Sequence, residues 1–377
     1  MFTKFSLRDY NFKLFFTVVI TIVIGIVCIN SADSSFTVRQ VIGAVMAVFI
    51  MAFVSAIDYE FICKLYMAIY GLNAALLLSV LLFGVEVNNA TRWINIGGDG
   101  GVQFQPSEFS KIMMIVCYST LLAKLRRDNE LNTVSGLGKM AVTAALPLGL
   151  IVLEPDLSTT LCLTFVLLTL IYLAGISYKL IAIAVLVFVP VAGSFIWYIQ
   201  RPDQILLKDY QVGRILQFIY PDQYGEDYSQ QNNSIMAIGS GELTGKGLNS
   251  STIATVKDAN FISEQQTDFI FSVIGEELGF VGSVFIVAIL LLLVLQCISV
   301  GRKAKDLKGM LIASGVACLI GYQSFINIGV ATGLLPNTGI PLPFISYGLS
   351  SLVSVCAGMG IVLNIPSYRF SLEVISE

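Results

Sequence analysis

The stretch QQTDFIFSVIGEELG, residues 265–279, places an acid, Asp268, directly before a run of large apolar residues. The whole sequence contains no histidine, which excludes Ser-His-Asp and Cys-His nucleophiles and imidazole proton relays. Acid–base chemistry at neutral pH therefore falls to carboxylates, ahead of Lys, Tyr or Cys. Asp268 is a candidate for that chemistry. The competing interpretation is an N-cap, which accepts backbone amides at the start of a helix.

A second polar stretch reads NNATRWINIGGDGGVQFQPSEFSKI. Arg92 and Lys111 have the charge to bind a phosphate or pyrophosphate, and Trp93 offers a stacking face to a sugar. The other interpretation is interfacial anchoring, because Trp suits the headgroup level and Arg can extend its guanidinium to water. Ser107 and Glu108 are predicted to cap a helix that begins beside them.

Two acids flank a proline in the stretch LEPDLSTT. Glu154 and Asp156 are predicted to form a tight turn at the membrane boundary, with Asp156 capping the next helix by accepting amides near Thr159. Carboxylates at that position could also bind a cation or orient a basic residue.

Glu276 and Glu277 lie deep in the apolar run that follows Asp268. On a straight helix they would be about 12–13 Å from Asp268, too far for a close catalytic pair. Carboxylates in apolar surroundings are costly unless paired, so we expect both to be buried against a basic or polar partner.

The stretch IMAIGSGELTGKGL is rich in glycine and includes Lys246. It lacks the GxxxxGK[ST] spacing of a nucleotide-binding loop. Within its first residues, the segment 235–238 is expected to form an interfacial helix that dips toward the membrane.

Composition indicates which elements position these residues. Of 377 residues, 56% are hydrophobic and 12% charged, and the mean hydropathy is +0.81. The chain is therefore predicted to be an all-α polytopic membrane protein with one integral membrane domain, residues 1–377. The seven cysteines include no CxxC pair and are interpreted as packing residues. No basic tract indicates a nucleic-acid partner.

Ten stretches are apolar enough to be membrane-spanning helices, with one large extracellular loop after the seventh. The fourth and fifth are short, so we expect each to be tilted, extended by loop residues, or only partly spanning. Small residues on the ninth helix, among them Gly315, Ala317 and Gly321, suit close packing against a partner helix. The ten stretches are residues 12–29, 41–57, 61–85, 110–124, 140–153, 157–175, 180–199, 269–300, 309–335 and 350–365.

The distribution of Lys and Arg predicts the orientation. The opposite short loops contain only Arg39, Arg92 and Lys111, so both termini are expected to be cytoplasmic. Residues 86–109 and 200–267 then form external loops that carry the active-site face. Fourteen of the 22 basic residues lie on the side of the termini: Lys4, Arg8, Lys13, Lys64, Lys124, Arg126, Arg127, Lys139, Lys179, Arg302, Lys303, Lys305, Lys308 and Arg369.

Taken together, the motifs resemble the SEDS family of bacterial envelope proteins (shape, elongation, division and sporulation), and among them the RodA type most closely. ATRWINIG, FQPSEFSKI, EPDLSTT, AIGSGELTGKGL, TDFIFSVIGEELGFVG and NTGIPLPFISYGLSS occur in family order over nearly the whole chain. The family's LPExHTDF is ISEQQTDF here, which keeps Glu264 but replaces the proline and the histidine.

The resemblance implies a SEDS fold and a peptidoglycan glycosyltransferase that polymerises lipid II on the outer face of the bacterial cytoplasmic membrane. Asp268 aligns with the family's essential acid and is expected to be the catalytic general base of an inverting transfer that releases undecaprenyl pyrophosphate. The substrate-binding candidates are Arg92, Trp93, Glu108, Lys111, Glu154, Asp156, Arg214, Lys246, Glu264, Thr338 and Ser346. Phosphate binding could also use a divalent cation, magnesium or manganese, and otherwise no cofactor is expected.

The resemblance also implies partners: a class B penicillin-binding protein with transpeptidase activity, lipid II and undecaprenyl-linked glycan, and membrane lipid. Three alternatives stay open. The chain could be a lipid II flippase, a division polymerase of the FtsW type, or a scaffold that holds a penicillin-binding protein without catalysis. Charges that gather at the external loops rather than at the bilayer midplane favour the enzyme over the transporter.

The predicted orientation can be tested with reporter fusions. Green fluorescent protein fused after Glu377 is expected to fluoresce, because it would fold in the cytoplasm. Alkaline phosphatase fused after Arg201 is expected to be active, because that loop would be external. The reverse pattern of the two reporters would contradict the orientation.

Overall fold

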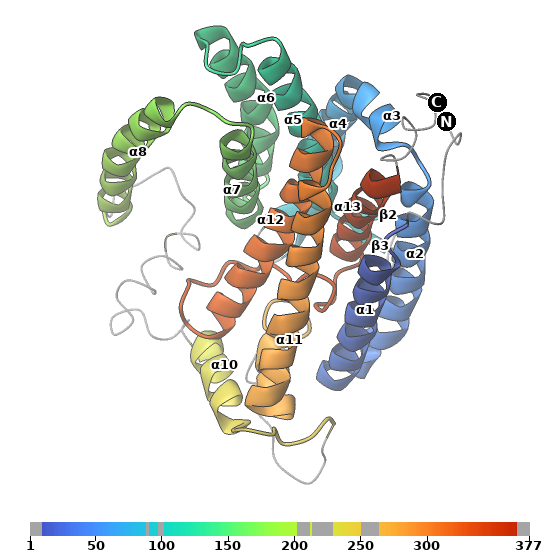
Figure 1. Cartoon of the computed structure of the whole chain (residues 1–377). Helices are drawn as coiled ribbons and strands as arrows, with labels where there is room; N and C mark the ends of the chain where they lie inside the picture. Colours follow the sequence, from blue (N-terminus) through green and yellow to red (C-terminus); the bar gives the residue numbers. More distant parts are fainter. Residues whose placement is uncertain are drawn as a thin grey trace.

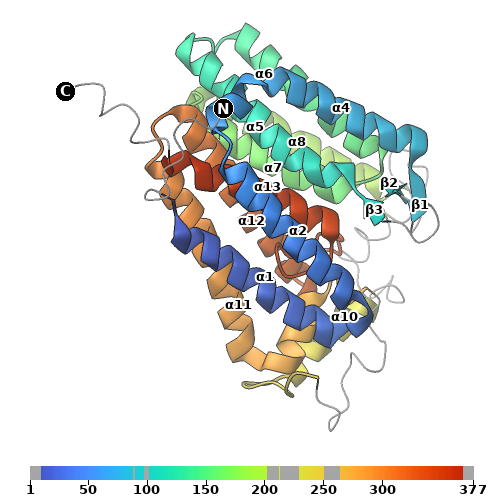
Figure 2. The same cartoon turned by 90° about the vertical axis from the view of Figure 1, so that its right-hand side faces the viewer.

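The computed structural model describes residues 10–87, 90–96, 102–201, 212, 229–249 and 264–367. Within them the chain is a bundle of long helices (Figure 1) with a small sheet at one end (Figure 2). The helices are α1 (Phe12–Ala32), the 3₁₀ turn η2 (Ser34–Phe36), α2 (Thr37–Ser55), α3 (Tyr59–Lys64), α4 (Tyr66–Phe83), α5 (Pro106–Arg127), α6 (Val134–Leu153), α7 (Leu157–Leu173), α8 (Tyr178–Ile199), α10 (Ser229–Ser240), α11 (Ile270–Arg302), α12 (Leu307–Ala331) and α13 (Leu349–Ser367).

All ten predicted membrane segments coincide with helices. In the described part, eight helices are long and apolar enough to cross a membrane. The apolar α7 has 17 residues, and α5 completes the ten. The two segments expected to be short are complete helices of 22 residues in α5 and 20 in α6. The first turns of α5 contain polar residues, so hydropathy alone did not include them in the predicted segment.

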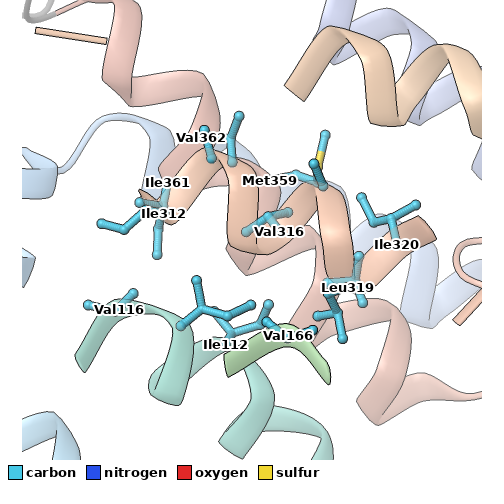
Figure 3. Close-up of a cluster of buried hydrophobic side chains, with 14 of the residues drawn as sticks. Ile112, Val116, Val166, Ile312, Val316, Leu319, Ile320, Met359, Ile361 and Val362 are labelled. Carbon is cyan, nitrogen blue, oxygen red and sulfur yellow. The ribbon is translucent and has the colours of Figure 1, made fainter. Parts of the chain in front are cut away.

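Helix α12 lies at the centre of the bundle and packs against α5, α7, α11 and α13 (Figure 1). Side chains from α5, α7, α12 and α13 meet there in one apolar cluster (Figure 3). A Cβ atom on Gly315 would lie 2.7 Å from Ile115, and Ala317 is fully buried. The expectation that these two small residues form a face for a partner helix is therefore wrong, because α12 uses them to approach its own neighbours.

Both ends of the described chain lie at one end of the bundle (Figure 2). The Tyr10 hydroxyl is 3.3 Å from Ser55 Oγ, at the end of α2. Asn364, near the end of α13, donates to the Ser55 carbonyl and accepts from the Tyr59 amide, both at 2.9 Å. The basic loops that follow α5 and α11 lie at this same end, whereas the sheet and α10 lie at the other (Figure 2).

A three-stranded antiparallel sheet lies between α4 and α5. Its order is β1 (Val85–Val87), β2 (Ala90–Ile96) and β3 (Val102–Phe104), with Trp93 opposite Val85 and Ile94 opposite Phe104. The sequence indicated only a glycine-rich loop here, because β1 and β3 have three residues each and are too short to show a periodic pattern. The sheet gives Arg92 and Trp93 fixed positions on β2.

Helix α11 is broken at Gly279, whose backbone angles are φ 64° and ψ −161°. The loop that follows α10 fills the break with backbone hydrogen bonds. The amides of Phe280 and Val281 donate to Glu242 and Leu243, at 2.9 and 3.1 Å. In return, the amides of residues 246 and 247 donate to the carbonyls of residues 276 and 277, each at 3.0 Å. The straight helix assumed from sequence is therefore wrong beyond residue 278.

Replacing Gly279 by alanine should destabilise the fold by roughly 2–4 kcal/mol, because φ is positive and the new Cβ would meet backbone. That Cβ would lie 2.3 Å from the Gly245 amide nitrogen. Gly71→Ala is the matched control, since no atom lies within 4 Å of a Cβ placed there. The measurement is the thermal unfolding midpoint of the purified proteins. Equal midpoints for the two variants would contradict the prediction.

Candidate active site

Asp268 lies at the end of the bundle that carries the sheet, two residues before α11. The N-cap position of α11 is Phe269, which makes no side-chain cap hydrogen bond. The N-cap interpretation of Asp268 is therefore wrong. Its side chain is half-buried, and a Cβ on Gly339 would lie 3.2 Å from Asp268 Oδ2. The carboxylate thus packs against Gly339, whose φ of 70° favours glycine.

Hydrogen bonds from Asn327 fix the backbone around Asp268. The Nδ2 atom of Asn327 donates to the Asp268 carbonyl at 2.9 Å and to the Ile340 carbonyl at 2.8 Å. One side chain of α12 therefore joins the segment before α11 to the loop before α13. Sequence reasoning missed this residue. The available signal was a buried amide, Asn327, four residues after another, Gln323, within an apolar helix.

Ser346 makes a second connection between the same two segments. Its hydroxyl donates to the Thr267 carbonyl at 2.6 Å and accepts from the Leu342 amide at 2.8 Å. The Tyr347 amide also donates to the Gln266 carbonyl at 2.9 Å. The structure thus places Ser346, a predicted substrate-binding residue, where it holds the Asp268 segment in position.

Asp156 organises the turn between α6 and α7. Its carboxylate accepts from the Thr159 amide at 3.1 Å and from the Thr159 hydroxyl at 2.9 Å, which confirms the predicted N-cap. Arg92 from β2 approaches the same carboxylate at 3.8 Å and donates to the carbonyl of Pro155. Asp156 therefore both caps a helix and orients a basic residue.

Glu108 and Lys111 form a buried ion pair in the first turns of α5. The Nζ and Oε1 atoms are 2.7 Å apart, and the side chains are 4% and 2% exposed for the acid and the base. The predicted cap by Ser107 and Glu108 is wrong, because the N-cap is Gln105 without a side-chain bond, and the helix starts with Pro106. The Ser107 hydroxyl lies 3.4 Å from Asp156 instead.

A small cavity of about 30 Å³ lies among these groups and has room for one or two waters. Three lining residues each have a buried polar atom without a hydrogen-bond partner in the described part of the chain: Arg92 Nε, Glu108 Oε2 and Gln323 Oε1. Such atoms need a water or a ligand. Gly339 is part of the wall, so the Asp268 carboxylate lies just behind it. The complete lining is Arg92, Gln105, Glu108, Lys111, Asp156, Thr159, Cys162, Gln323, Gly339, Ile340 and Pro341.

Three further predicted residues are described outside the lining of this cavity. Thr338 accepts a hydrogen bond from Ser158 through its carbonyl, and its own hydroxyl is buried without a partner in the described chain. Trp93 is half-buried on β2. Glu264 is exposed, and its Oε2 accepts from Gln266 at 3.2 Å within its own turn.

Lys246 and Glu276 form a separate pair at the break in α11. Their Nζ and Oε1 atoms are 2.7 Å apart, and Ser31 donates to Glu277 Oε1 at 2.7 Å. The expectation that both glutamates are buried against a basic or polar partner is confirmed. Lys246 does not line the small cavity, although it was predicted to bind the same substrate as Arg92. Arg214, another predicted substrate ligand, lies outside the described residues.

The described residues contain no group of three or more His, Cys, Asp or Glu side chains that could hold a metal ion. They therefore do not fit a metal site built from protein ligands alone. The seven cysteines are free thiols, and six are buried, as expected of packing residues.

Glu154 is fully buried beside Asp156, and neither of its carboxylate oxygens has a hydrogen-bond partner in the described chain. Burial, and then the charge of Asp156, raise the pKa of Glu154 to about 8, while Arg92 acts in the opposite direction. The side chain is therefore protonated at neutral pH, in contrast to the ionised role that the sequence suggested for this turn.

Glu154→Gln should stabilise the protein at alkaline pH. The folded state favours the protonated acid because the pKa rises from 4.5 to about 8 on folding. This contribution is complete below about pH 4.5 and is lost as the pH rises to about 8. The measurement is the difference in unfolding midpoint, variant minus wild type, at each pH. This difference should be several degrees larger at pH 9 than at pH 5. A difference that does not change with pH would contradict the prediction.

Comparisons with known proteins match the whole length of the bundle. A family model described as cell cycle protein, for FtsW, RodA and SpoVE, matches residues 7–370. The peptidoglycan glycosyltransferase MrdB of Escherichia coli K12 is 34% identical over 81% of this chain and 78% of its own. The probable peptidoglycan glycosyltransferase FtsW of Bacillus subtilis 168 is 31% identical over 97% of this chain and 92% of its own.

Solved structures agree with this assignment. One, described as showing how a peptidoglycan synthase complex coordinates polymerization and crosslinking, has a TM-score of 0.79 at 25% identity, over 96% of this chain and 99% of that one. The rod shape determining protein RodA of Thermus thermophilus has a TM-score of 0.69 at 25% identity, over 96% of this chain and 98% of its own. The chain therefore belongs to the SEDS family of FtsW, RodA and SpoVE proteins, and its helices form the fold seen in RodA.

Proposed function

We propose that this protein is a peptidoglycan glycosyltransferase that polymerises lipid II during cell elongation, with Asp268 as general base. The observation that carries the proposal is the position of the Asp268 carboxylate. It packs against Gly339, and Gly339 forms part of the wall of a polar cavity that also includes Arg92 and Lys111. An acid and two cations thus lie at one end of a membrane bundle.

In the proposed reaction the 4-hydroxyl of the acceptor sugar attacks the anomeric carbon of the donor. Asp268 takes the hydroxyl proton as the new glycosidic bond forms. The bond from the anomeric carbon to the lipid pyrophosphate breaks with inversion, and undecaprenyl pyrophosphate leaves. The lipid tails of both substrates remain in the bilayer while their sugars reach the end of the bundle.

The surroundings of the two cations favour different roles for them. The Arg92 side chain is 21% exposed and lies 3.8 Å from its acid, so its guanidinium can add a phosphate contact. The Lys111 side chain is 2% exposed and lies 2.7 Å from Glu108. We therefore assign pyrophosphate binding to Arg92, while Lys111 is held in its ion pair with Glu108.

We propose that a divalent cation takes part as a companion of the substrate. Magnesium and manganese bind readily through phosphate oxygens with one or two carboxylates, which does not require a complete protein site. When bound, the cation would neutralise charge on the departing pyrophosphate.

Two buried acids count against the transporter alternative. Glu276 and Glu277 were the only acids expected deep in the bilayer. Both contribute to packing at the break in α11, through Lys246 and Ser31. A scaffold without catalysis does not require a polar cavity beside an acid that is held in position by Asn327. The similar identities to MrdB and FtsW leave elongation as a proposal that rests on the GIPLPFISYG motif.

We propose a class B penicillin-binding protein as the partner, because one similar solved structure is of a complex for polymerization and crosslinking. An apolar groove of about 440 Å³ lies between α10, α11 and α12. It is lined by Phe280, Val284 and Val287, among other residues, and these three are 41–64% exposed. A single transmembrane helix has the chemistry to cover such a groove.

The test is polymerisation of purified lipid II by wild type and by Asp268→Asn, each with a class B penicillin-binding protein and with magnesium or manganese. Loss of the general base should lower the rate at least 100-fold. Asp33→Asn, which removes another acid at the same end of the bundle, should retain activity. Folding of each variant is checked by its unfolding midpoint.

Polymer from Asp268→Asn at the wild-type rate would remove Asp268 from the chemistry. The base would then be sought at Glu264, Glu154 or Asp156. No polymer from wild type with the correct partner and metal would overturn the glycosyltransferase proposal itself.

A further inference from the structure

A second charged cavity lies at the opposite end of the bundle from Asp268. Its volume is about 400 Å³, within the range of small-molecule sites. It is formed by α3, α4, the end of α5 and the start of α12. The lining is Glu60, Cys63, Lys64, Tyr66, Thr120, Ala123, Lys124, Arg127, Asp306, Leu307 and Lys308. Four cations and two acids give this lining a net charge of +2.

Both acids of the lining have local roles of their own. Asp306 accepts from the Tyr59 hydroxyl at 3.0 Å and from the Gly309 amide at 2.8 Å, and it lies 3.5 Å from Lys308. Glu60 lies in the first turn of α3, where the helix dipole favours an acid. Neither acid forms an ion pair with a cation of α3 or α5 in the described chain.

Two ammonium groups of the lining have no carboxylate within ion-pair distance in the described chain, those of Lys64 and Lys124. Lys124 is held in place without an acid, because its Nζ donates to the Tyr66 hydroxyl at 3.0 Å and lies 4.3 Å from the centre of the Tyr66 ring. A phenol, unlike a carboxylate, does not neutralise the ammonium charge, so Lys124 can still bind an anion.

Exposed apolar side chains flank the cavity. Leu65 and Met67, on either side of Tyr66, are 44% and 66% exposed, as expected of residues that face acyl chains. Leu307 and Ala123 add apolar lining within the cavity. An occupant with both an anionic head and apolar chains fits this combination better than a soluble anion does.

We propose that this cavity binds the phosphate headgroup of an anionic phospholipid from the cytoplasmic leaflet, with Lys64 and Lys124 as the main contacts. The basic loops place this end of the bundle on the cytoplasmic side, where the leaflet carries anionic lipid. The site is separate from the glycosyl-transfer chemistry, because it lies at the other end of the bundle.

The test uses the full-length protein in micelles of a zwitterionic detergent, titrated with phosphatidylglycerol and followed by native mass spectrometry. Lys64→Gln with Lys124→Gln should weaken binding roughly 10- to 30-fold. The control is Arg302→Gln with Lys303→Gln, which removes the same charge from exposed positions at the same end that do not line the cavity. It should change binding less than threefold.

Two further arms identify the source of the anion and the role of the phenol. Glycerol 3-phosphate should bind far more weakly than phosphatidylglycerol, because it has no acyl chains. Tyr66→Phe should weaken lipid binding only a few-fold, because it removes the hydroxyl that holds Lys124 but keeps the ring. The proposal is overturned if the lysine variant binds like wild type, if the control loses binding equally, or if glycerol 3-phosphate binds as tightly as the lipid.

Discussion

One amide nitrogen, Nδ2 of Asn327, determines where the candidate catalytic acid lies. It satisfies the carbonyls of Asp268 and Ile340 at once, in a part of the bundle where backbone groups cannot rely on water. The two segments that it joins are both irregular, so neither has a helical ladder to fix its position. The contact between the Asp268 carboxylate and Gly339 follows from that connection. The Ser346 bond to the Thr267 carbonyl supports it from the other side.

The polar groups near Asp268 are arranged mainly as pairs of opposite charge. Arg92 has Asp156 and Lys111 has Glu108, so the cavity wall is close to neutral although it is rich in ionisable groups. Buried pairs add little net stability, because desolvation offsets the attraction. Each pair instead holds its two charged side chains in fixed positions and orientations. Glu154, without a cation at hydrogen-bonding distance, is the exception, and burial shifts it to its neutral form.

Hydropathy predicted the membrane helices well, because a spanning helix must be apolar over its whole length. Two kinds of feature could not be predicted from it. The break at Gly279 depends on a loop more than thirty residues earlier that offers the missing hydrogen bonds, and a glycine within an apolar run is equally compatible with a continuous helix. The roles of Asn327 and Ser346 depend on segments that meet only in the folded bundle. Asp268 and Asp156 were found from sequence, because turn acids beside apolar runs are conspicuous. The structure was needed to show which of these acids caps its own helix. Asp156 does, and Asp268 does not.

The filled break in α11 also has a consequence for the order of assembly. Lys246 and Glu276 are 30 residues apart in the chain, whereas the Ser31–Glu277 contact at the same break joins residues 246 apart. Closing the longer loop costs about 2 kcal/mol more in chain entropy. The contact between the 241–247 loop and α11 can therefore form soon after α11 is synthesised, before α1 docks against it. The backbone hydrogen bonds that fill the break therefore join residues of the later half of the chain, and α1 adds the Ser31 contact.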